Sequence, residues 1–274
     1  MKIHAIQTGT VSIRPNQRLG KGKGVIRLIN TLTDRRWTEP LPIYAWVIEH
    51  PKGVILIDTG ETARATEPGY FPSWHPYFKN VSIEVKPEQE VGPQLQKIGI
   101  HPKDVRWVIM THLHTDHAGG LHHFSHSEII IMERAFRLAT GFMGKMLGFL
   151  PHRFPTWLEP TLINLSPEPF GPFDASWKLT EDVIIVPTPG HTQAHISVIL
   201  KDNGIHYFFA GDASYTQQSM LDQQIDGVSL NGKTARRTLR RIRKFAQENP
   251  TVYLPSHDPQ SAVRLEDRET VNLP

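Results

Sequence analysis

Short apolar runs that end at a polar residue dominate the pattern of this chain. Residues 54–57 read Val-Ile-Leu-Ile and stop at Asp58, and residues 207–210 lead through Gly211 into Asp212. Short runs rich in β-branched and aromatic residues are typical of buried strands. We therefore expect each of these runs to bring a carboxylate to the edge of a sheet.

The rest of the pattern predicts alternating strands and helices. Strands are expected over residues 45–50, 54–58, 104–110, 129–131, 183–186, 196–200 and 207–210, with a hairpin turn at 51–53. Helices are expected over residues 91–100, near 133–140 and from 234 to 246, and an irregular loop over 61–88. Strands followed by a helix, twice, favour an α/β fold: an αββα sandwich of two mixed β-sheets flanked by helices, formed by one domain over 1–274.

Composition narrows the class of protein. With 274 residues, 39% of them hydrophobic, the chain can bury a large core, which excludes disorder as its overall state. The net charge of +3 is small for this length, so we expect no nucleic-acid partner. No segment has the apolar length of a membrane span and the first residues do not resemble a secretory leader, so we expect a cytoplasmic protein with no membrane partner.

The absence of cysteine and the abundance of histidine define the available chemistry. Without cysteine, any metal must be held by His and carboxylate side chains. Of the 15 histidines, three follow one predicted strand together with a carboxylate, as His112-x-His114-x-Asp116-His117. Side chains of such a turning segment can face two neighbouring points, which is what two adjacent metal ions need.

Three more candidate ligands follow later predicted strands. His191 follows the strand at 183–186, Asp212 follows the strand at 207–210, and His257 follows another apolar stretch. Loops that follow strands can meet at one sheet edge, so we expect these side chains to complete the metal site. The histidines without such a context, expected to be structural or on the surface, are His122, His123, His126 and His195.

This ligand pattern resembles the metallo-β-lactamase superfamily of dinuclear hydrolases. The resemblance covers nearly the whole chain, includes Asp58-Thr59-Gly60, and implies the αββα fold. The ligand roles that it implies are His112, His114 and His191 for the first metal, Asp116, His117 and His257 for the second, and Asp212 as a bridge. Imidazole ligation of the first metal favours zinc, although cobalt, iron and manganese also occupy sites of this type.

Within the superfamily, the segment after Asp212 resembles the N-acyl-homoserine lactonases. Tyr215 lies at the position beyond the bridging Asp where those enzymes keep a Tyr, and Ser256-His257-Asp258 resembles their His-Asp pair. The chain lacks the Cys of the commoner β-lactamases, and the diiron flavoproteins have Glu in place of His114. It departs from many lactonases at Thr115, where they have an aromatic residue, so the resemblance implies no acyl-chain preference.

The resemblance implies a quorum-quenching lactonase that opens the ring of N-acyl-homoserine lactones, with the acyl lactone as its partner and a homodimer as its assembly. The expected nucleophile is a hydroxide that bridges the two metals, because bound cations lower the pKa of water. Tyr215 is expected to donate to the developing oxyanion, and Asp116 to return a proton to the leaving alkoxide. Asp58 is expected to orient a ligand imidazole such as that of His114.

Other activities share parts of this pattern. A glyoxalase II-type thioester hydrolase would use the same metal site, but it needs cationic residues to hold a glutathione carboxylate. A phosphodiesterase or nuclease would use the basic face over 236–244, for which a solvated amphipathic helix is the simpler explanation. A metal-binding protein without catalysis gives no reason for a bridged, open site. The apolar segment 141–150 is expected to be a packed helix end or a wall for an acyl chain.

Overall fold

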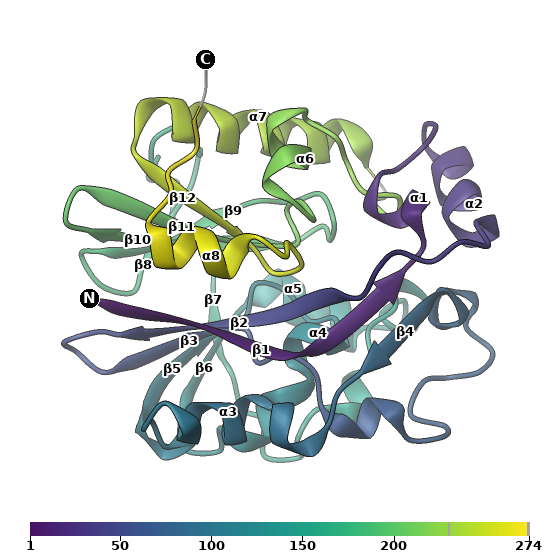
Figure 1. Cartoon of the computed structure of the whole chain (residues 1–274), viewed down its shortest axis with the longest axis horizontal. Helices are drawn as coiled ribbons and strands as arrows, with labels where there is room; N and C mark the ends of the chain where they lie inside the picture. Colours follow the sequence, from purple (N-terminus) through teal and green to yellow (C-terminus); the bar gives the residue numbers. More distant parts are fainter. Residues whose placement is uncertain (230, 273–274) are drawn as a thin grey trace. The chain divides into compact units, whose positions relative to one another are not determined.

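The strands of the computed structural model form two mixed sheets, one in each of two units of the chain (Figure 1). The structure describes residues 1–229 and 231–272. Unit 1 consists of Met1–Ile13 and Thr38–Ile163, and unit 2 of Arg14–Trp37 and Asn164–Pro274. Two mixed sheets with accompanying helices confirm the α/β class predicted from the sequence.

Unit 1 contains a seven-stranded sheet in the order β4-β1-β2-β3-β5-β6-β7. Its strands are β1 (Lys2–Ile13), β2 (Leu41–Glu49), β3 (Val54–Ile57), β4 (Val81–Glu84), β5 (Val105–Ile109), β6 (Glu128–Met132) and β7 (Thr161–Ile163). The first four strands pair in antiparallel fashion, whereas β3, β5, β6 and β7 pair in parallel. Because β3 and β5 run in the same direction, the residues that follow them emerge at the same edge of the sheet.

Short helices connect the strands of unit 1. Its α-helices are α3 (Val91–Lys97), α4 (Thr115–Ala118) and α5 (Glu133–Thr140). The 3-10 turns are η1 (Ala63–Thr66), η2 (Pro76–Asn80), η3 (Pro87–Gln89), η4 (Pro102–Asp104), η5 (Gly119–His123), η6 (Lys145–Leu147) and η7 (Pro151–Arg153). The predicted hairpin between β2 and β3 is present, closed by the Gly53 N–H, which donates to the His50 carbonyl at 2.9 Å.

Two segments of unit 1 differ from the sequence-based expectation. Residues 61–88 are not wholly irregular, because β4 lies within them and pairs with the end of β1. Residues 141–150 do not continue α5 as a packed helix end. Phe142 is 97% exposed, whereas Phe149 is buried, so this loop turns from solvent into the core over a few residues.

Unit 2 contains a five-stranded sheet in the order β12-β11-β10-β9-β8. Its strands are β8 (Trp177–Lys178), β9 (Val183–Pro187), β10 (Ile196–Asp202), β11 (Ile205–Gly211) and β12 (Thr251–Pro255). Its helices are α1 (Pro15–Arg18), α2 (Val25–Thr33), α6 (Gln217–Leu221), α7 (Gly232–Glu248) and α8 (Ser261–Asp267). β10 is antiparallel to both β9 and β11, and β11 is parallel to β12, so β9, β11 and β12 all end at one edge.

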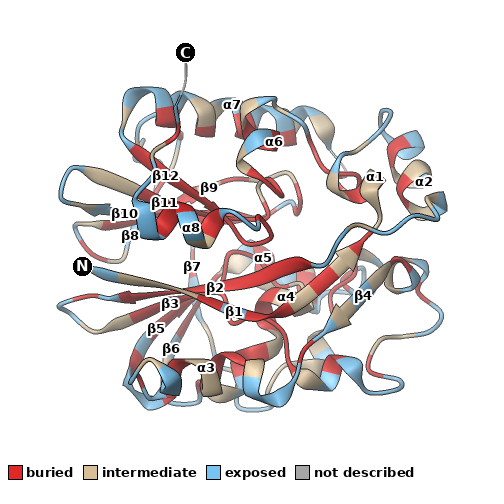
Figure 2. Ribbon diagram, in the orientation of Figure 1, coloured by how far each residue is buried: buried red, intermediate tan, exposed pale blue. Residues whose placement is uncertain are grey.

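The amphipathic helix predicted from residue 234 is α7, which covers one face of this sheet. Its buried residues are Ala235, Thr238, Leu239, Ile242, Phe245 and Ala246. The apolar members of this set pack in one core cluster with Phe208 and Tyr253 of the strands. Figure 2 shows the opposite side of α7 exposed to solvent. Part of its basic face makes structural contacts: Arg241 pairs with Asp174, and Arg236 donates to the Gln223 carbonyl at 3.0 Å.

Among residues 1–229 and 231–272, no helix combines the length and apolar character that crossing a membrane requires. The longest helix is α7, with 17 residues, and its exposed side is strongly basic.

Replacing Leu239 by Ala is expected to lower the free energy of unfolding by about 2–5 kcal/mol, because Leu239 is wholly buried between α7 and the sheet and its loss leaves a cavity. Urea unfolding followed by circular dichroism measures this change. Arg240→Ala, an exposed site on the same helix, is the matched control and should shift the value by no more than about 0.5 kcal/mol. Equal effects of the two substitutions would contradict the proposed packing.

Candidate functional site

A sharp turn after β3 brings a buried carboxylate to the sheet edge of unit 1. Asp58 has a left-handed backbone conformation, with φ of 58°, and Gly60 follows with φ of 64°. A Cβ on Gly60 would lie 1.9 Å from Oγ1 of Thr8, so only glycine fits there. The Asp58 N–H donates to the Ile109 carbonyl at 2.9 Å, which joins the turn to the end of β5.

The Asp58 carboxylate holds the segment that follows β5. Its Oδ1 accepts from the Thr111 N–H and its Oδ2 from the Thr111 hydroxyl, both at 2.8 Å. Nδ1 of His117 lies 2.8 Å from the same Oδ2. When Nδ1 donates to this carboxylate, Nε2 of His117 presents its lone pair on the other side of the ring, ready to bind a cation.

Asp58 meets a ligand-candidate imidazole, as expected from the sequence, but this imidazole is that of His117 and not that of His114, which served as the example. The reason is that α4 returns His117 to the turn after β3. The backbone N–H of Thr59 donates to the His117 carbonyl at 2.7 Å, and the Thr59 hydroxyl donates to the same oxygen at 2.8 Å. These contacts depend on the path of the chain through α4, which the spacing of the motif does not reveal.

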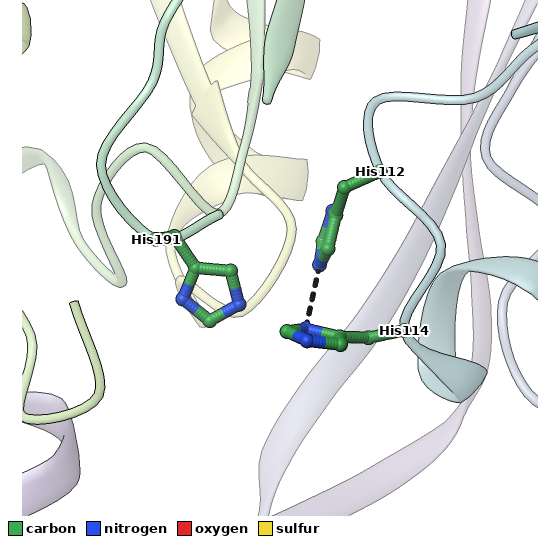
Figure 3. A group of neighbouring side chains, drawn as sticks. All are labelled: His112, His114 and His191. Carbon is green, nitrogen blue, oxygen red and sulfur yellow. Dashed lines mark hydrogen bonds between the residues drawn. The ribbon is translucent and has the colours of Figure 1, made fainter. Parts of the chain in front are cut away.

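Three imidazoles of the predicted motif gather at the end of β5. Figure 3 shows Nε2 of His112 and Nδ1 of His114 directed at one another, 3.1 Å apart. Two ligands at about 2.0–2.1 Å from a tetrahedral zinc ion lie about 3.4 Å apart, so this pair fits one ion. The rings of His112 and His117 have centroids 4.0 Å apart, and Oδ1 of Asp116 lies 4.0 Å from Nε2 of His117.

An aromatic ring lies against one of these imidazoles. Phe149 stacks on His114 with ring centroids 4.9 Å apart and an interplanar angle of 27°. The neighbouring position 115, where the sequence departs from the lactonase pattern, is a Thr. The aromatic neighbour of His114 therefore comes from the loop after α5.

Two glycines after α4 allow the motif to approach the turn after β3. A Cβ on Gly119 would lie 2.3 Å from Oε1 of Glu61, and one on Gly120 would lie 2.3 Å from the Thr59 carbonyl oxygen. The close approach of this segment to the turn after β3 therefore requires glycine at both positions. Glu61 is fully buried here, and burial raises its pKa to about 8, although the Thr62 N–H donates to its carboxylate. No local sequence pattern marks Glu61 as part of the site.

In unit 2, Asp212 presents one oxygen to each of two imidazoles. Its Oδ2 lies 3.4 Å from Nε2 of His191, and its Oδ1 lies 3.3 Å from Nε2 of His257. All three side chains are buried. His191, Asp212 and His257 follow β9, β11 and β12, which end at the same sheet edge, as expected from the sequence. A carboxylate whose oxygens face different imidazoles has the arrangement needed to bridge two cations.

A second buried carboxylate orients His191. Oδ2 of Asp226 lies 3.4 Å from Nδ1 of His191 and accepts from the Ser229 hydroxyl at 2.8 Å. Burial alone would raise the pKa of Asp226, but hydrogen bonds from His191 and Ser229 hold it below its usual value. Figure 3 shows His191 on the loop after β9. Asp226 was not predicted from the sequence, because it follows no strand.

Two more residues of unit 2 support the segments that carry Asp212 and His257. His195 is structural, as expected: its Nε2 accepts from the Asp212 N–H at 3.0 Å. Asp258 follows His257 and is buried. Its carboxylate accepts from the Gln217 N–H at 2.9 Å and from Arg264 at 2.5 Å, so it organises the loop that follows His257.

Tyr215 lies beside the ligand candidates of unit 2. Its ring stacks on His257 with centroids 5.5 Å apart, and its hydroxyl oxygen accepts from Nε2 of Gln17 at 3.0 Å. Gln17 lies on α1 and is 1% exposed. Tyr215 was predicted from the sequence but Gln17 was not, because the two residues lie far apart in the chain.

Replacing Asp58 by Asn is expected to weaken metal binding about 10- to 100-fold, because the buried anion that orients the His117 ring is lost. Competition with a chromogenic zinc chelator measures the change. Asp267→Asn, on the exposed side of α8, is the matched control and should leave the affinity unchanged. Wild-type affinity in the Asp58 variant would show that this carboxylate does not support a metal ligand.

Known proteins match the chain over most of its length. The family model of the Metallo-beta-lactamase superfamily matches residues 38–257. An N-acyl homoserine lactonase of Bacillus cereus is 24% identical over 220 residues, covering 80% of this chain and 82% of the relative. The N-acyl homoserine lactonase AttM of Azorhizobium caulinodans is 23% identical over 269 residues, covering 95% of this chain and 94% of the relative.

The fold agrees with a solved structure of similar size. The structure of an N-acyl homoserine lactone hydrolase, with the product N-hexanoyl-L-homoserine bound at its catalytic metal centre, superposes with a TM-score of 0.77 and 20% sequence identity, covering 98% of this chain and 96% of the other. The family match extends from before β2 to His257 and includes every ligand candidate derived above. The chain therefore belongs to the metallo-β-lactamase superfamily.

Proposed function

We propose that the protein is a metal-dependent hydrolase that opens the lactone ring of N-acyl homoserine lactones. The observation that carries the proposal is the Asp212 carboxylate, whose oxygens face His191 and His257, with Tyr215 stacked on the second of these imidazoles. The names of the two relatives support the choice of substrate class.

We propose that the ligand groups of the two units serve one dinuclear centre and that the units act together as one hydrolase domain. The first metal would be held by His112, His114 and His191, the second by Asp116, His117 and His257, with Asp212 as the shared ligand. Within each unit the residues fit a metal, because imidazole nitrogens converge in unit 1 and the carboxylate in unit 2 divides its oxygens between two imidazoles. Neutral nitrogen and carboxylate ligands favour zinc.

When bound, two such cations activate water for attack and polarise the lactone carbonyl. The chain supplies the other groups of the reaction. The hydroxyl oxygen of Tyr215 accepts a hydrogen bond from Gln17, which fixes its position, and a phenolic hydroxyl can also act as a donor. We propose that it donates to the carbonyl oxygen of the lactone, where negative charge develops during attack.

Asp116 is suited to carry a proton. Its side chain is 19% exposed, whereas the side chains of Asp58 and Asp212 are nearly inaccessible. An acid that transfers protons between water and a leaving group must reach both, and Asp116 has this access. We propose that it takes a proton from the attacking water and gives it to the alkoxide that leaves when the ring opens.

The proposal predicts that purified protein acidifies a weakly buffered solution of an N-acyl homoserine lactone, because ring opening releases a carboxylic acid. Chelation should abolish this activity, and added zinc should restore it. S-lactoylglutathione, assayed in parallel, is the matched thioester substrate. Cleavage of the thioester with no opening of the lactone would overturn the substrate assignment and leave the metal ligands standing.

Tyr215→Phe is expected to keep its metal and to lower kcat about 10- to 100-fold, at or somewhat below the scale of one oxyanion donor. Gln17→Met is expected to lower kcat about 2- to 10-fold, as one hydrogen bond worth about 0.5–1.5 kcal/mol would. Steady-state kinetics together with metal analysis measures both changes.

The double variant distinguishes an effect through Tyr215 from a general loss of structure. If Gln17 acts only by orienting the Tyr215 hydroxyl, Gln17→Met should cause no further loss in the Tyr215→Phe background. Losses that multiply in the double variant would show that Gln17 acts independently of Tyr215.

A further inference from the structure

A second group of metal-ligand side chains lies in unit 1, among residues that the proposed dinuclear centre does not use. Glu90 precedes α3, and His122 and His123 end the 3-10 turn η5. Oε2 of Glu90 lies 2.7 Å from Nε2 of His123 and 3.1 Å from Nε2 of His122. One potential ligand atom from each residue lies within 4.8 Å of the other two, which is compatible with three ligands around one small ion.

The surroundings hold the carboxylate in position. Oε1 of Glu90 accepts from the Thr62 hydroxyl at 3.0 Å and from the Ala63 N–H at 2.8 Å. These two donors fix the plane of the carboxylate and direct its other oxygen, Oε2, at the two imidazoles. A ligand carboxylate that is itself held by hydrogen bonds is the usual arrangement at protein metal sites.

The surroundings also orient the imidazoles. Nδ1 of His122 lies 3.1 Å from the backbone carbonyl oxygen of Gly119. A carbonyl oxygen only accepts, so Nδ1 carries the proton, and Nε2 of the neutral ring presents a lone pair. The ring of His123 lies against Gly92, where an added Cβ would be 2.5 Å from Nδ1 of His123. Both rings are therefore oriented before any ion arrives.

This arrangement requires a positive charge between the groups. With His122 neutral, its Nε2 lone pair would face the negatively charged oxygen of Glu90 at 3.1 Å, and two acceptors repel one another. A proton on Nε2 relieves the repulsion, and the Glu90 carboxylate accordingly raises the pKa of His122. A divalent cation relieves it as well, and it also engages His123.

We propose that Glu90, His122 and His123 form a further zinc site. Two imidazoles and one carboxylate are ligands that zinc accepts, and the side chain of His122 is 44% exposed, which leaves a side open to solvent for a water as fourth ligand. Such an ion ties together the segment after β3, the start of α3 and the turn η5. Because η5 directly follows α4, the ion stabilises the segment that carries Asp116 and His117.

Zinc counting tests this proposal directly. After equilibrium dialysis of the full-length protein at micromolar free zinc, metal analysis by mass spectrometry should find about one zinc per chain less in His122→Asn than in the wild type. The side chain of His122 is 44% exposed, so the variant is expected to fold. Equal zinc content in variant and wild type would overturn the proposal.

Two further variants make the result specific. Glu90→Gln keeps an oxygen for the Thr62 and Ala63 donors but removes the charge, so it should lose the same zinc. His126→Asn replaces an exposed histidine that lies close by in sequence, and it should keep the wild-type content. If His126→Asn lost the same amount, the zinc would be bound to surface histidines in general, and the proposal would fail.

Nitrogen-15 NMR of the histidine rings distinguishes a zinc ion bound to Nε2 from a proton carried by Nε2. At saturating zinc, the Nε2 atoms of His122 and His123 should carry no proton, and their nitrogen-15 shifts should change on chelation. A His122 ring that stays doubly protonated at saturating zinc would overturn the proposal. None of these measurements depends on lactone hydrolysis, so their outcome is independent of the proposed activity.

Discussion

The ligand arrangement of unit 1 depends on one buried anion. The Asp58 carboxylate, at the end of β3, binds both the backbone and the hydroxyl of Thr111 at the end of β5, and it also meets the His117 ring. A buried carboxylate without such partners would cost several kcal/mol, so its position and that of the segment 111–117 determine one another. The parallel pairing of β3 and β5 makes this contact available, because it brings both strand ends to one edge.

Unit 2 also places a buried carboxylate, that of Asp212, directly after a strand. Asp212 faces two imidazoles, while His195 accepts a hydrogen bond from its backbone N–H and Asp226 orients the ring of His191. The oxygens of Asp212 are thus aimed by the ends of β9, β11 and β12, which share a sheet edge. In both units the regular pairing of strands, rather than the loops alone, determines where the ligand atoms lie.

The sequence predicted those parts of the molecule whose signal is local. The core strands β3, β5 and β9, the helix α5 and the buried face of α7 follow from periodicity, and the ligand candidates follow from strand ends. The strand β1 was not predicted, because its pattern is interrupted where the register shifts between Gln7 and Thr10. β4 was missed because it lies in a stretch rich in proline and aromatic residues.

The residues that orient the candidate site residues could not be predicted from local sequence patterns. Gln17 reaches Tyr215 across most of the chain, Asp226 meets His191 from a turn, and Glu90 meets η5 from the start of another helix. Each contact exists only once the tertiary structure has formed, and no local pattern marks it. Which ligand-candidate imidazole Asp58 meets has the same origin, since it depends on how α4 returns the chain.

Phe149 stacks on His114, but the two residues belong to different segments of the chain, so mutations can change one without the other. The candidate ligands of unit 1 are encoded in one short motif, whereas the aromatic ring beside them is encoded in the loop after α5. Substitutions in that loop alter the shape and polarity next to His114 without touching a candidate ligand atom. Selection can therefore vary the surroundings of the candidate ligands in small steps while the motif that carries them is inherited intact.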